Sequence, residues 1–262
     1  MIYVITHKKF DDSILDNEKY KVLHVGKNND YKHYYLRDDI GDSISEKNAN
    51  YCELTGLYWI WRNAKEKNDE IDGIVHYRRY FTTTKQNFLY NYFGIMPSIL
   101  PYETIETSLK NYDIILPKRR KAIRRVRETY SYFHDAEDLK ILEEVIEKVS
   151  PEYIGDYRRV LNRHSYYYAN MMICRHKLLE EYAEWLFRIL NETEKHIDLN
   201  KYTDSYQKRV FGFMSERLLQ VWVMHNGLKV KEYDVFNTEE RGDTFIKSNI
   251  KRVKRIFGKN EK

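Results

Sequence analysis

Short apolar runs rich in Ile, Val and Tyr recur through the first 120 residues, and they constrain the fold of this chain more than any other feature. They are IYVIT at 2–6, KVLHVG at 21–26, IDGIV at 71–75 and YDIILP at 112–117. Runs of this length and composition predict buried β-strands. An apolar helical segment at 52–61, preceded by Ser43 and Glu46 at capping-box spacing, separates the second run from the third. Strands that alternate with helices favour an α/β fold with a mainly parallel sheet flanked by helices.

The second half of the chain is predicted to be mostly helical. The segment LKILEEVIEKV places Leu139, Leu142 and Ile146 at helical spacing, and further helices are expected at about 178–190 and 205–225. Strands are expected at 166–174 and at about 228–235. The chain has no internal repeat and no linker rich in Pro, Gly or Ser, so we expect residues 1–246 to form a single domain.

The positive charge of the chain is concentrated at its end. The net charge is +5, whereas residues 247–262 hold seven Lys or Arg and one Glu, which leaves the remaining residues at −1. The apolar residues Ile250, Val253, Ile256 and Phe257 recur there at helical spacing, which is typical of a basic amphipathic helix on an anionic membrane surface. The alternative is a disordered tail that only aids solubility. A second basic cluster, KRRKAIRRVR at 118–127, is local, so general binding of nucleic acid is not favoured.

The sequence also indicates a cytoplasmic protein. No apolar run approaches the roughly 18 residues that a membrane-spanning helix requires, and the opening MIYVITHKKF is too short for a signal peptide. The two cysteines, Cys52 and Cys174, stand far apart without CxxC spacing, so we expect reduced thiols in the core.

The run at 71–75 ends in a cluster of cationic and aromatic side chains, His76-Tyr77-Arg78-Arg79-Tyr80. Ligands of α/β proteins bind at the carboxyl ends of the strands, and Thr6 and His7 follow another strand in the same way. The planar guanidinium group binds phosphate in a bidentate manner without a metal. The motifs GxxxxGK[ST], GxGxxG, HExxH and paired CxxC are all absent from the sequence, so the arginines are the candidate phosphate ligands. The alternative is that both arginines pair with acids such as Asp72 or Glu53 and only brace the sheet.

Two pairs in the second half are candidates for acid–base chemistry. Glu216 and Arg217 lie on a largely apolar helix, as a catalytic base with its partner or as a buried structural ion pair. His134 and Asp135 form a His–carboxylate pair, or Asp135 caps the helix that follows. Tyrosine is abundant, with 24 copies, which suits the binding of sugar rings or the packing of a Tyr-rich core.

Five segments together resemble the DUF4422 family: ISEKNANYCELTGLYWIWRN, IDGIVHYRRYF, YDIILP, YYYANMMICRHKLLEEYAEWLF and RVFGFMSERLLQVW. The resemblance extends from about residue 2 to 235. Members of this family are encoded in bacterial capsule and exopolysaccharide clusters and are regarded as glycosyltransferases. The resemblance implies a GT-A-like fold, with a donor-binding part at about 1–120 and an acceptor part at about 121–246. The helix-rich C-terminal half and the basic C-terminal helix are expected from the sequence patterns described above.

The resemblance assigns roles to residues at the strand ends. In most GT-A enzymes the corresponding strand ends in an Asp-x-Asp motif that binds a divalent metal, whereas this chain has His76, Arg78 and Arg79 there. The resemblance therefore implies that cationic side chains replace the metal, with Asp38, Asp39 and Asp42 as the alternative ligands of Mn²⁺ or Mg²⁺. The implied donor-binding residues are Thr6, His7, Asp39, Asn50, Glu53, Tyr58, His76, Arg78 and Arg79.

These implications lead to one expected function and one competing class. The expected function is transfer of a hexosyl group, galactose or galactofuranose, from a UDP-sugar to a growing lipid-linked polysaccharide at the inner face of the membrane. Glu216 is the expected base for the acceptor hydroxyl, with His134 and Asp135 as second candidates. The competing class is a non-catalytic module that binds polysaccharide or RNA through the tyrosines and the 118–127 cluster.

Overall fold

The computed structural model describes residues 1–64 and 70–239, and the predicted basic helix at 247–262 lies outside the described residues. The strands are β1 (Ile2–Thr6), β2 (Tyr20–His24), β3 (Leu36–Arg37), β4 (Ile71–His76), β5 (Arg79–Thr82), β6 (Ile114–Pro117), β7 (Arg120–Lys121), β8 (Ser165–Tyr166), β9 (Met172–Arg175) and β10 (Val230–Asn237). The α-helices are α1 (Asn48–Tyr51), α2 (Leu54–Asn63), α3 (Thr84–Phe93), α4 (Tyr102–Ser108), α5 (Val126–Phe133), α6 (Ala136–Val149), α7 (Ile154–Leu161), α8 (His176–Glu194) and α9 (Val210–His225). Short 3-10 helices span Ser45–Lys47, Pro151–Tyr153, Leu199–Lys201 and Gln207–Arg209.

One sheet organises the molecule, in the order β3-β2-β1-β4-β5-β10-β6-β9, and β9 also pairs with β4. Strands β3, β2, β1 and β4 are parallel to one another; the predicted strands β1, β2 and β4 are among them, whereas β3 was not predicted. The prediction of a mainly parallel sheet is wrong for the other half, because β9 runs antiparallel to β4 and β6, and β10 runs antiparallel to β5. The α/β class is confirmed, and the sheet as a whole is mixed.

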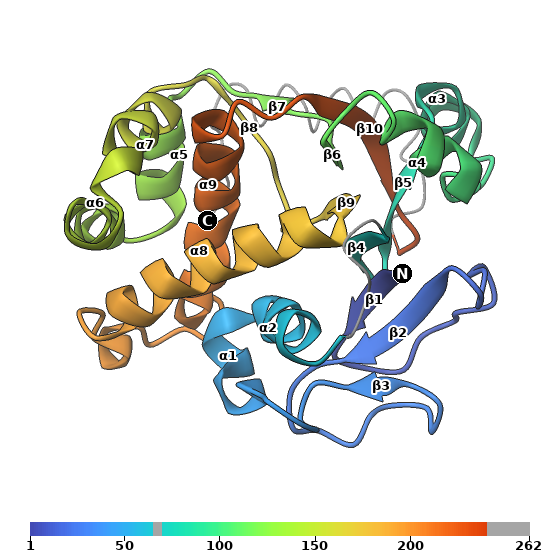
Figure 1. The fold of residues 1–262 in the computed structure, drawn as a ribbon, viewed down its shortest axis with the longest axis horizontal. Coiled ribbons are helices and arrows are strands. Elements are labelled where there is room, and N and C mark those ends of the chain that lie inside the picture. Colours follow the sequence, from blue (N-terminus) through green and yellow to red (C-terminus); the bar gives the residue numbers. More distant parts are fainter. Residues whose placement is uncertain (65–69, 240–262) are drawn as a thin grey trace.

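Helices cover the sheet on both faces (Figure 1). Side chains of a strand alternate between its two faces, so Tyr3 and Ile5 of β1 belong to the core under α2, α8 and α9. Ile2 and Val4 belong to a second core, to which α3 and α4 contribute Tyr90 and Ile105. Several tyrosines contribute to the core, in agreement with the expectation of a Tyr-rich core. Those that are fully buried are Tyr51, Tyr80, Tyr130, Tyr157, Tyr167 and Tyr182.

Two glycines allow the close packing on which the site depends. A Cβ atom on Gly56 would lie 2.8 Å from Ile5 Cδ1, so a larger residue would push α2 away from β1. A Cβ atom on Gly73 of β4 would lie 2.7 Å from Ile173 Cγ1 of β9. These contacts hold the start of α2 and the strand β9 close to the middle of the sheet.

Three predicted elements differ from those observed. The capping box at Ser43 is wrong, because Ser43 Oγ accepts a hydrogen bond from Ser45 N and the chain then forms the 3-10 helix, α1 and α2 in turn. The strand predicted at 166–174 is interrupted, since Ala169 has a left-handed φ of 58°. The helix predicted at 205–225 begins as an α-helix only at Val210. Within the described ranges, no helix combines the length and apolar character that crossing a membrane requires.

Candidate active site

The strand register brings several predicted residues to one edge of the sheet. In the parallel pairs, Ile5 lies opposite His76, and Thr6 lies opposite His24. The carboxyl ends of β1, β2 and β4 therefore meet at the same edge, as the sequence predicted. Thr6 itself is buried and shapes the chain at this edge, because its hydroxyl donates a hydrogen bond to Lys8 O at 2.6 Å.

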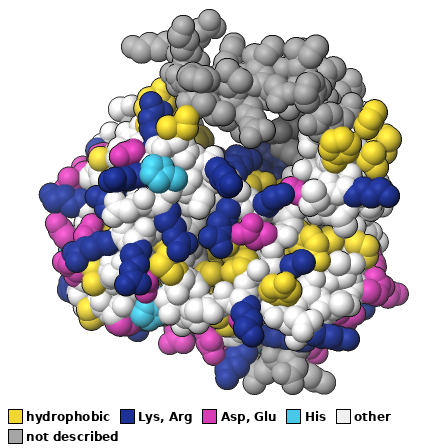
Figure 2. Space-filling view, turned by 90° about the horizontal axis from the view of Figure 1, so that it is seen from above, with side chains coloured by type: hydrophobic (Ala, Val, Ile, Leu, Met, Phe, Trp, Pro, Cys, Tyr) yellow, Lys and Arg dark blue, Asp and Glu magenta, His cyan; other side chains and the backbone are white. Residues whose placement is uncertain are grey.

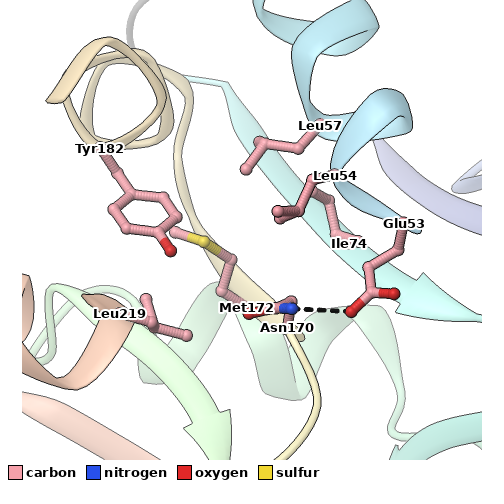
Figure 3. Close-up of a pocket in the computed structure, with 8 residues that line it drawn as sticks. All are labelled: Glu53, Leu54, Leu57, Ile74, Asn170, Met172, Tyr182 and Leu219. Carbon is pink, nitrogen blue, oxygen red and sulfur yellow. Dashed lines mark hydrogen bonds between the residues drawn. The ribbon is translucent and has the colours of Figure 1, made fainter. Parts of the chain in front are cut away.

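The antiparallel strand β9 adds a residue from the second half of the chain. Ile74 pairs with Met172, and continuing this register places Asn170 opposite His76. The Asn170 side chain is buried, and its Nδ2 donates a hydrogen bond to Glu53 Oε1 at 2.7 Å (Figure 3). The same Nδ2 also lies 3.3 Å from Gly212 O of α9. Asn170 therefore joins the start of α2 to α9 at the edge of the sheet.

Behind Glu53 and Asn170 lies a small apolar cavity, shown in Figure 3. It is lined by Leu54, Leu57, Ile74, Met172, Tyr182 and Leu219. The cavity is too small for a sugar ring, so it is a packing void rather than a ligand site.

Two strained residues position the polar groups. Cys52 (φ 55°) and Ala169 (φ 58°) are the non-glycine residues with left-handed φ in the described part of the chain, and they immediately precede Glu53 and Asn170. A residue with a Cβ atom is disfavoured in this conformation by roughly 1–2 kcal/mol, and such strain occurs preferentially at functional sites. Both cysteines are free, as expected, but Cys52 is only partly buried and lies at this edge rather than in the core.

The carboxylate of Glu216 approaches the same edge from α9. Its Oε1 accepts a hydrogen bond from Ala169 N at 3.0 Å, and its Oε2 accepts one from Arg217 Nη1 at 2.8 Å. Burial raises the pKa of Glu216; Arg217 opposes this rise, whereas Glu53 adds to it. A carboxyl group with a raised pKa is a stronger base when it is ionised, which suits general base chemistry near neutral pH. Both interpretations of the Glu216–Arg217 pair are therefore compatible with its geometry.

Arg79 lies at the centre of this group. Its Nη1 lies 3.5 Å from His76 Nδ1, and its charge lowers the pKa values of both His76 and Glu216. The largest effect on the pKa of His76 is burial, which also lowers it and so favours the neutral imidazole. Within 1–64 and 70–239, Arg79 has no ion-pair partner. This guanidinium is thus available for an anionic ligand.

Among the residues described, neither Arg78 nor Arg79 forms the ion pair with Asp72 or Glu53 that would brace the sheet. Arg78 instead forms an exposed ion pair with Glu239 at 2.9 Å. Asp72 binds the terminal amino group of Met1 and the ring of His176, at the opposite end of β4.

A rim of further cations surrounds His7, which is exposed and packs edge-on against the ring of Tyr77. Partial burial lowers the pKa of His7, and the neighbouring charges of Lys8 and Arg78 lower it further. Arg209 acts in the same direction. The positive potential at this edge therefore comes from three segments that are distant in the sequence.

Arg209 was not identified from the sequence. Its Nε lies 3.0 Å from Cys52 Sγ, next to Glu53. The available signal was its position immediately before Val210, the first residue of α9. A cation at the amino end of a helix is disfavoured by the helix dipole, so an arginine there suggests a role other than helix stability.

Besides Arg217 Nε, two buried polar atoms of the site lack hydrogen-bond partners among the residues described. They are His76 Nε2 and Asn170 Oδ1, on side chains that are 9% and 7% exposed. Buried polar groups are nearly always hydrogen-bonded, so such atoms at an open edge are candidates for contact with a ligand.

Other predicted donor residues are engaged elsewhere. Asn50 Nδ2 donates to Lys208 O, and Asp39 forms a bidentate pair with Arg37. Tyr58 OH donates to Asp42 Oδ1 at 3.1 Å, and its ring packs against Phe187. The structure does not bring these side chains into contact with Glu53, His76 or Arg79.

His134 and Asp135 do not form a pair with each other. Asp135 caps α6, as the alternative interpretation held, and forms an ion pair with Lys201 at 2.8 Å. His134 stacks on Phe213 and hydrogen-bonds Gln207 through Nδ1.

The alternative metal ligands are also engaged. Asp42 pairs with Arg62, and buried Asp38 accepts a hydrogen bond from Gly26 N at 2.9 Å. In the ranges that the structure describes, no three His, Cys, Asp or Glu side chains are placed to hold a metal ion. The arrangement that remains is a cationic edge with two carboxylates, suited to an anionic ligand and a proton transfer beside it.

Comparisons with known proteins give two matches. The model of a family described as a domain of unknown function, DUF4422, matches residues 1–227. Among solved structures, the apo structure of the bifunctional glycosyltransferase WbbM is similar, with a TM-score of 0.76 and 31% sequence identity. The similarity covers 91% of this chain and 45% of that one, so this chain spans less than half the length of WbbM. No curated protein matches the chain.

Proposed function

The chain belongs to the DUF4422 family, and from this premise we propose that it is a glycosyltransferase. The proposed reaction transfers a hexosyl group, galactose or galactofuranose, from a UDP-sugar to a growing lipid-linked polysaccharide. The observation that carries the reaction class is the similarity to WbbM over nearly the whole chain. The local chemistry supports it, because Arg79 lies beside two carboxylates at the ligand-binding edge of an α/β sheet.

The anionic donor suits the cationic edge. Arg79, together with Arg78, Arg209 and Lys8 on the rim around His7, would bind the diphosphate of the UDP-sugar. In the transfer, the bond from the anomeric carbon to the diphosphate oxygen breaks, and UDP leaves with the electron pair. Guanidinium groups neutralise the charge that develops on the leaving group. We propose that they do so without a metal ion.

The carboxylates of Glu216 and Glu53 suit the activation and binding of an acceptor hydroxyl. The acceptor hydroxyl oxygen forms the new bond to the anomeric carbon, and its proton passes to Glu216 as the general base. Glu53 and Asn170 stand next to this position, and Asn170 Oδ1 is an unused hydrogen-bond acceptor for a sugar hydroxyl. His134 and Asp135 are weaker candidates for the base, because their side chains are already engaged as a stacked ring and a helix cap.

A lipid-linked acceptor would place the protein at the inner face of the membrane. The basic residues at 247–262 are the proposed contact with anionic lipid. This part of the proposal rests on the sequence of the tail, since it lies outside the described residues.

The decisive experiment is incubation of the purified protein with a panel of UDP-sugars, with release of UDP as the readout. We expect slow release from one donor even without an acceptor, because water replaces the acceptor hydroxyl. Glu216→Gln should lose this activity, whereas Glu184→Gln, on the exposed side of α8, should keep it. Absence of UDP release from every donor, together with binding of polysaccharide or RNA, would favour the non-catalytic module instead.

A further inference from the structure

The corner formed by α3 and the loop after it exposes an apolar cluster, which we call the apolar corner. Its members are Phe88, Phe93, Ile95 and Met96, with exposed fractions of 50%, 67%, 55% and 57%. The rings of Phe88 and Phe93 are in contact, with centroids 6.3 Å apart. Soluble proteins seldom gather large apolar side chains in this way unless the surface binds something.

The apolar corner is anchored firmly to the sheet. Tyr90 of α3 is buried in the second core, and its hydroxyl donates a hydrogen bond to Asn237 O of β10 at 3.0 Å. Thr83 caps α3 by accepting a hydrogen bond from Gln86 N. Phe88 and Phe93 therefore lie on a helix that is packed into the second core and hydrogen-bonded to β10, and Ile95 and Met96 follow directly after this helix.

The basic cluster at 118–127 lies on the same face of the molecule. Figure 2 shows Lys and Arg side chains across the middle of this face and hydrophobic side chains protruding at its right, over the α3 region. The cluster contains seven Lys or Arg and no acid, and the segment 82–101 contains one Lys and no acid. Within the described part of the chain, only Arg119 of the cluster forms an ion pair, with Glu232. Ile123, in the middle of the cluster, is 64% exposed.

From this arrangement we propose that the apolar corner and the basic cluster form a membrane-docking face for anionic phospholipid. The corner inserts Phe93, Ile95 and Met96 among the acyl chains next to the headgroups, and Ile123 does the same within the cluster. The surrounding Lys and Arg side chains bind the lipid phosphates. An anionic bilayer surface combines both chemistries, since it offers negative charge above an apolar layer.

Two other occupants fit less well. Single-stranded RNA would use exposed aromatic rings for stacking, but Arg120 already lies over Tyr168 at 3.5 Å and Arg124 over Tyr132 at 4.5 Å. A second copy of the chain could cover the apolar corner, but a symmetric contact would bring two unpaired basic clusters together. A lipid surface meets neither difficulty.

The strand β10 links this face to the candidate active site. Tyr233 O of β10 accepts a hydrogen bond from the backbone N of Lys118, the first residue of the basic cluster. At the other end of the strand, Asn237 pairs with Arg79 and its carbonyl oxygen receives the Tyr90 hydroxyl. The inference adds a docking surface in the folded domain to the proposed contact through the tail. It rests on the proposed function only for the suggestion that the acceptor is lipid-linked.

The test is co-sedimentation of the full chain with vesicles of phosphatidylglycerol and phosphatidylcholine, compared with vesicles of phosphatidylcholine alone. Phe93→Ser/Met96→Ser should lower the partition coefficient on anionic vesicles about tenfold or more, because two apolar side chains no longer insert. Arg120→Gln/Lys121→Gln should lower it about 25-fold, since each cation near the surface contributes about a fivefold effect and the two effects multiply. The controls are Ile40→Ser, another exposed apolar residue, and Lys140→Gln/Lys177→Gln, two exposed lysines on other helices. Both controls should bind like the wild type.

Three results would overturn the inference. The first is wild-type binding by both test variants, which would assign any membrane contact to the tail. The second is a dimer of the wild type that Phe93→Ser/Met96→Ser dissociates, measured by light scattering. The third is a loss of affinity for single-stranded RNA in Arg120→Gln/Lys121→Gln without a loss of vesicle binding. UDP release measured without vesicles is independent of these outcomes, so failure of the docking face and failure of the glycosyltransferase proposal remain distinguishable.

Discussion

Replacing Glu216 by Gln tests the proposed base directly, because Gln is nearly isosteric and lacks the basic carboxylate. The Gln carbonyl oxygen retains the hydrogen bond from Ala169 N, which preserves the turn before Asn170. The general base is lost, and a positioned base contributes about 10²–10⁴-fold to turnover. We therefore expect turnover to fall by this factor, with little change in binding of the UDP-sugar.

The same substitution also removes an ion pair, so its effect on stability must be separated from its effect on catalysis. The Arg217 side chain is 9% exposed and that of Glu216 is 24% exposed. Breaking a fully buried pair costs about 3–5 kcal/mol, and the partial exposure of Glu216 reduces the cost here to roughly 2–3 kcal/mol. Thermal melting of Glu216→Gln, run beside the kinetics, measures this cost.

Arg217→Met is the matched variant, because it breaks the ion pair and keeps the carboxylate. It should also melt early, but it should retain turnover within about tenfold of the wild type. The charge of Arg217 lowers the pKa of Glu216, so its removal raises that pKa. Because the base must be ionised to act, the acid limb of the pH–rate profile should move to higher pH in this variant.

The reasoning is refuted if Glu216→Gln melts early and keeps the turnover of the wild type per folded molecule. The Glu216–Arg217 pair would then be structural, and Glu53 would become the carboxylate to test. An unshifted pH–rate profile in an active Arg217→Met variant would likewise remove Glu216 from the proton transfer.

Three further predictions concern the cationic edge and the core. Arg79→Gln should lower turnover about 10²–10³-fold. Arg78→Gln should lower it less, because Arg78 is exposed and pairs with Glu239. If both variants melt early and lose equally little turnover, the two arginines have a structural role. Turnover should survive EDTA, and its complete loss followed by recovery with Mn²⁺ or Mg²⁺ would contradict the metal-independent proposal. Burial raises the pKa of Asp38 to about 6, above the value of roughly 4 that an Asp has in the unfolded chain. The contribution of this carboxyl group to the stability of the folded state is therefore fully present below pH 4 and is lost as the pH rises through 6. Relative to Asp38→Asn, the wild type should therefore lose on the order of 2–3 kcal/mol of unfolding free energy between pH 4 and 8, and denaturant titrations of both proteins that run parallel across this range would show that the carboxyl group is not perturbed.

Much of the framework follows from local patterns in the sequence. The strands at 2–6 and 71–75 were predicted, and β1 and β4 are observed there, because an apolar run of this length buries itself as a strand wherever it lies in the chain. The position of His76 and Arg79 at the ligand-binding edge follows from the strand directions alone, since the carboxyl ends of parallel strands share one edge.

Several candidate side chains have a local partner that the motifs did not indicate. Asp39 lies two residues from Arg37 and pairs with it, and Asp42 meets Arg62 of α2. Asp135 serves as a helix cap. A carboxylate in a sequence carries no information about which cation will neutralise it, so such candidates cannot be ranked without coordinates.

The grouping of Glu53, His76, Asn170 and Glu216 was decided by the tertiary structure. It depends on the antiparallel insertion of β9 beside β4, and a shift of one residue in that register would turn Asn170 to the other face of the sheet. It depends equally on α9, which carries Glu216 to Ala169 across 47 positions of sequence. The sequence by itself determined that the apolar runs at 2–6 and 71–75 form strands and which side chains follow them, because these are local consequences of composition. Only the packing of distant segments decided which of those side chains meet, because strand register and helix docking are set by the core as a whole.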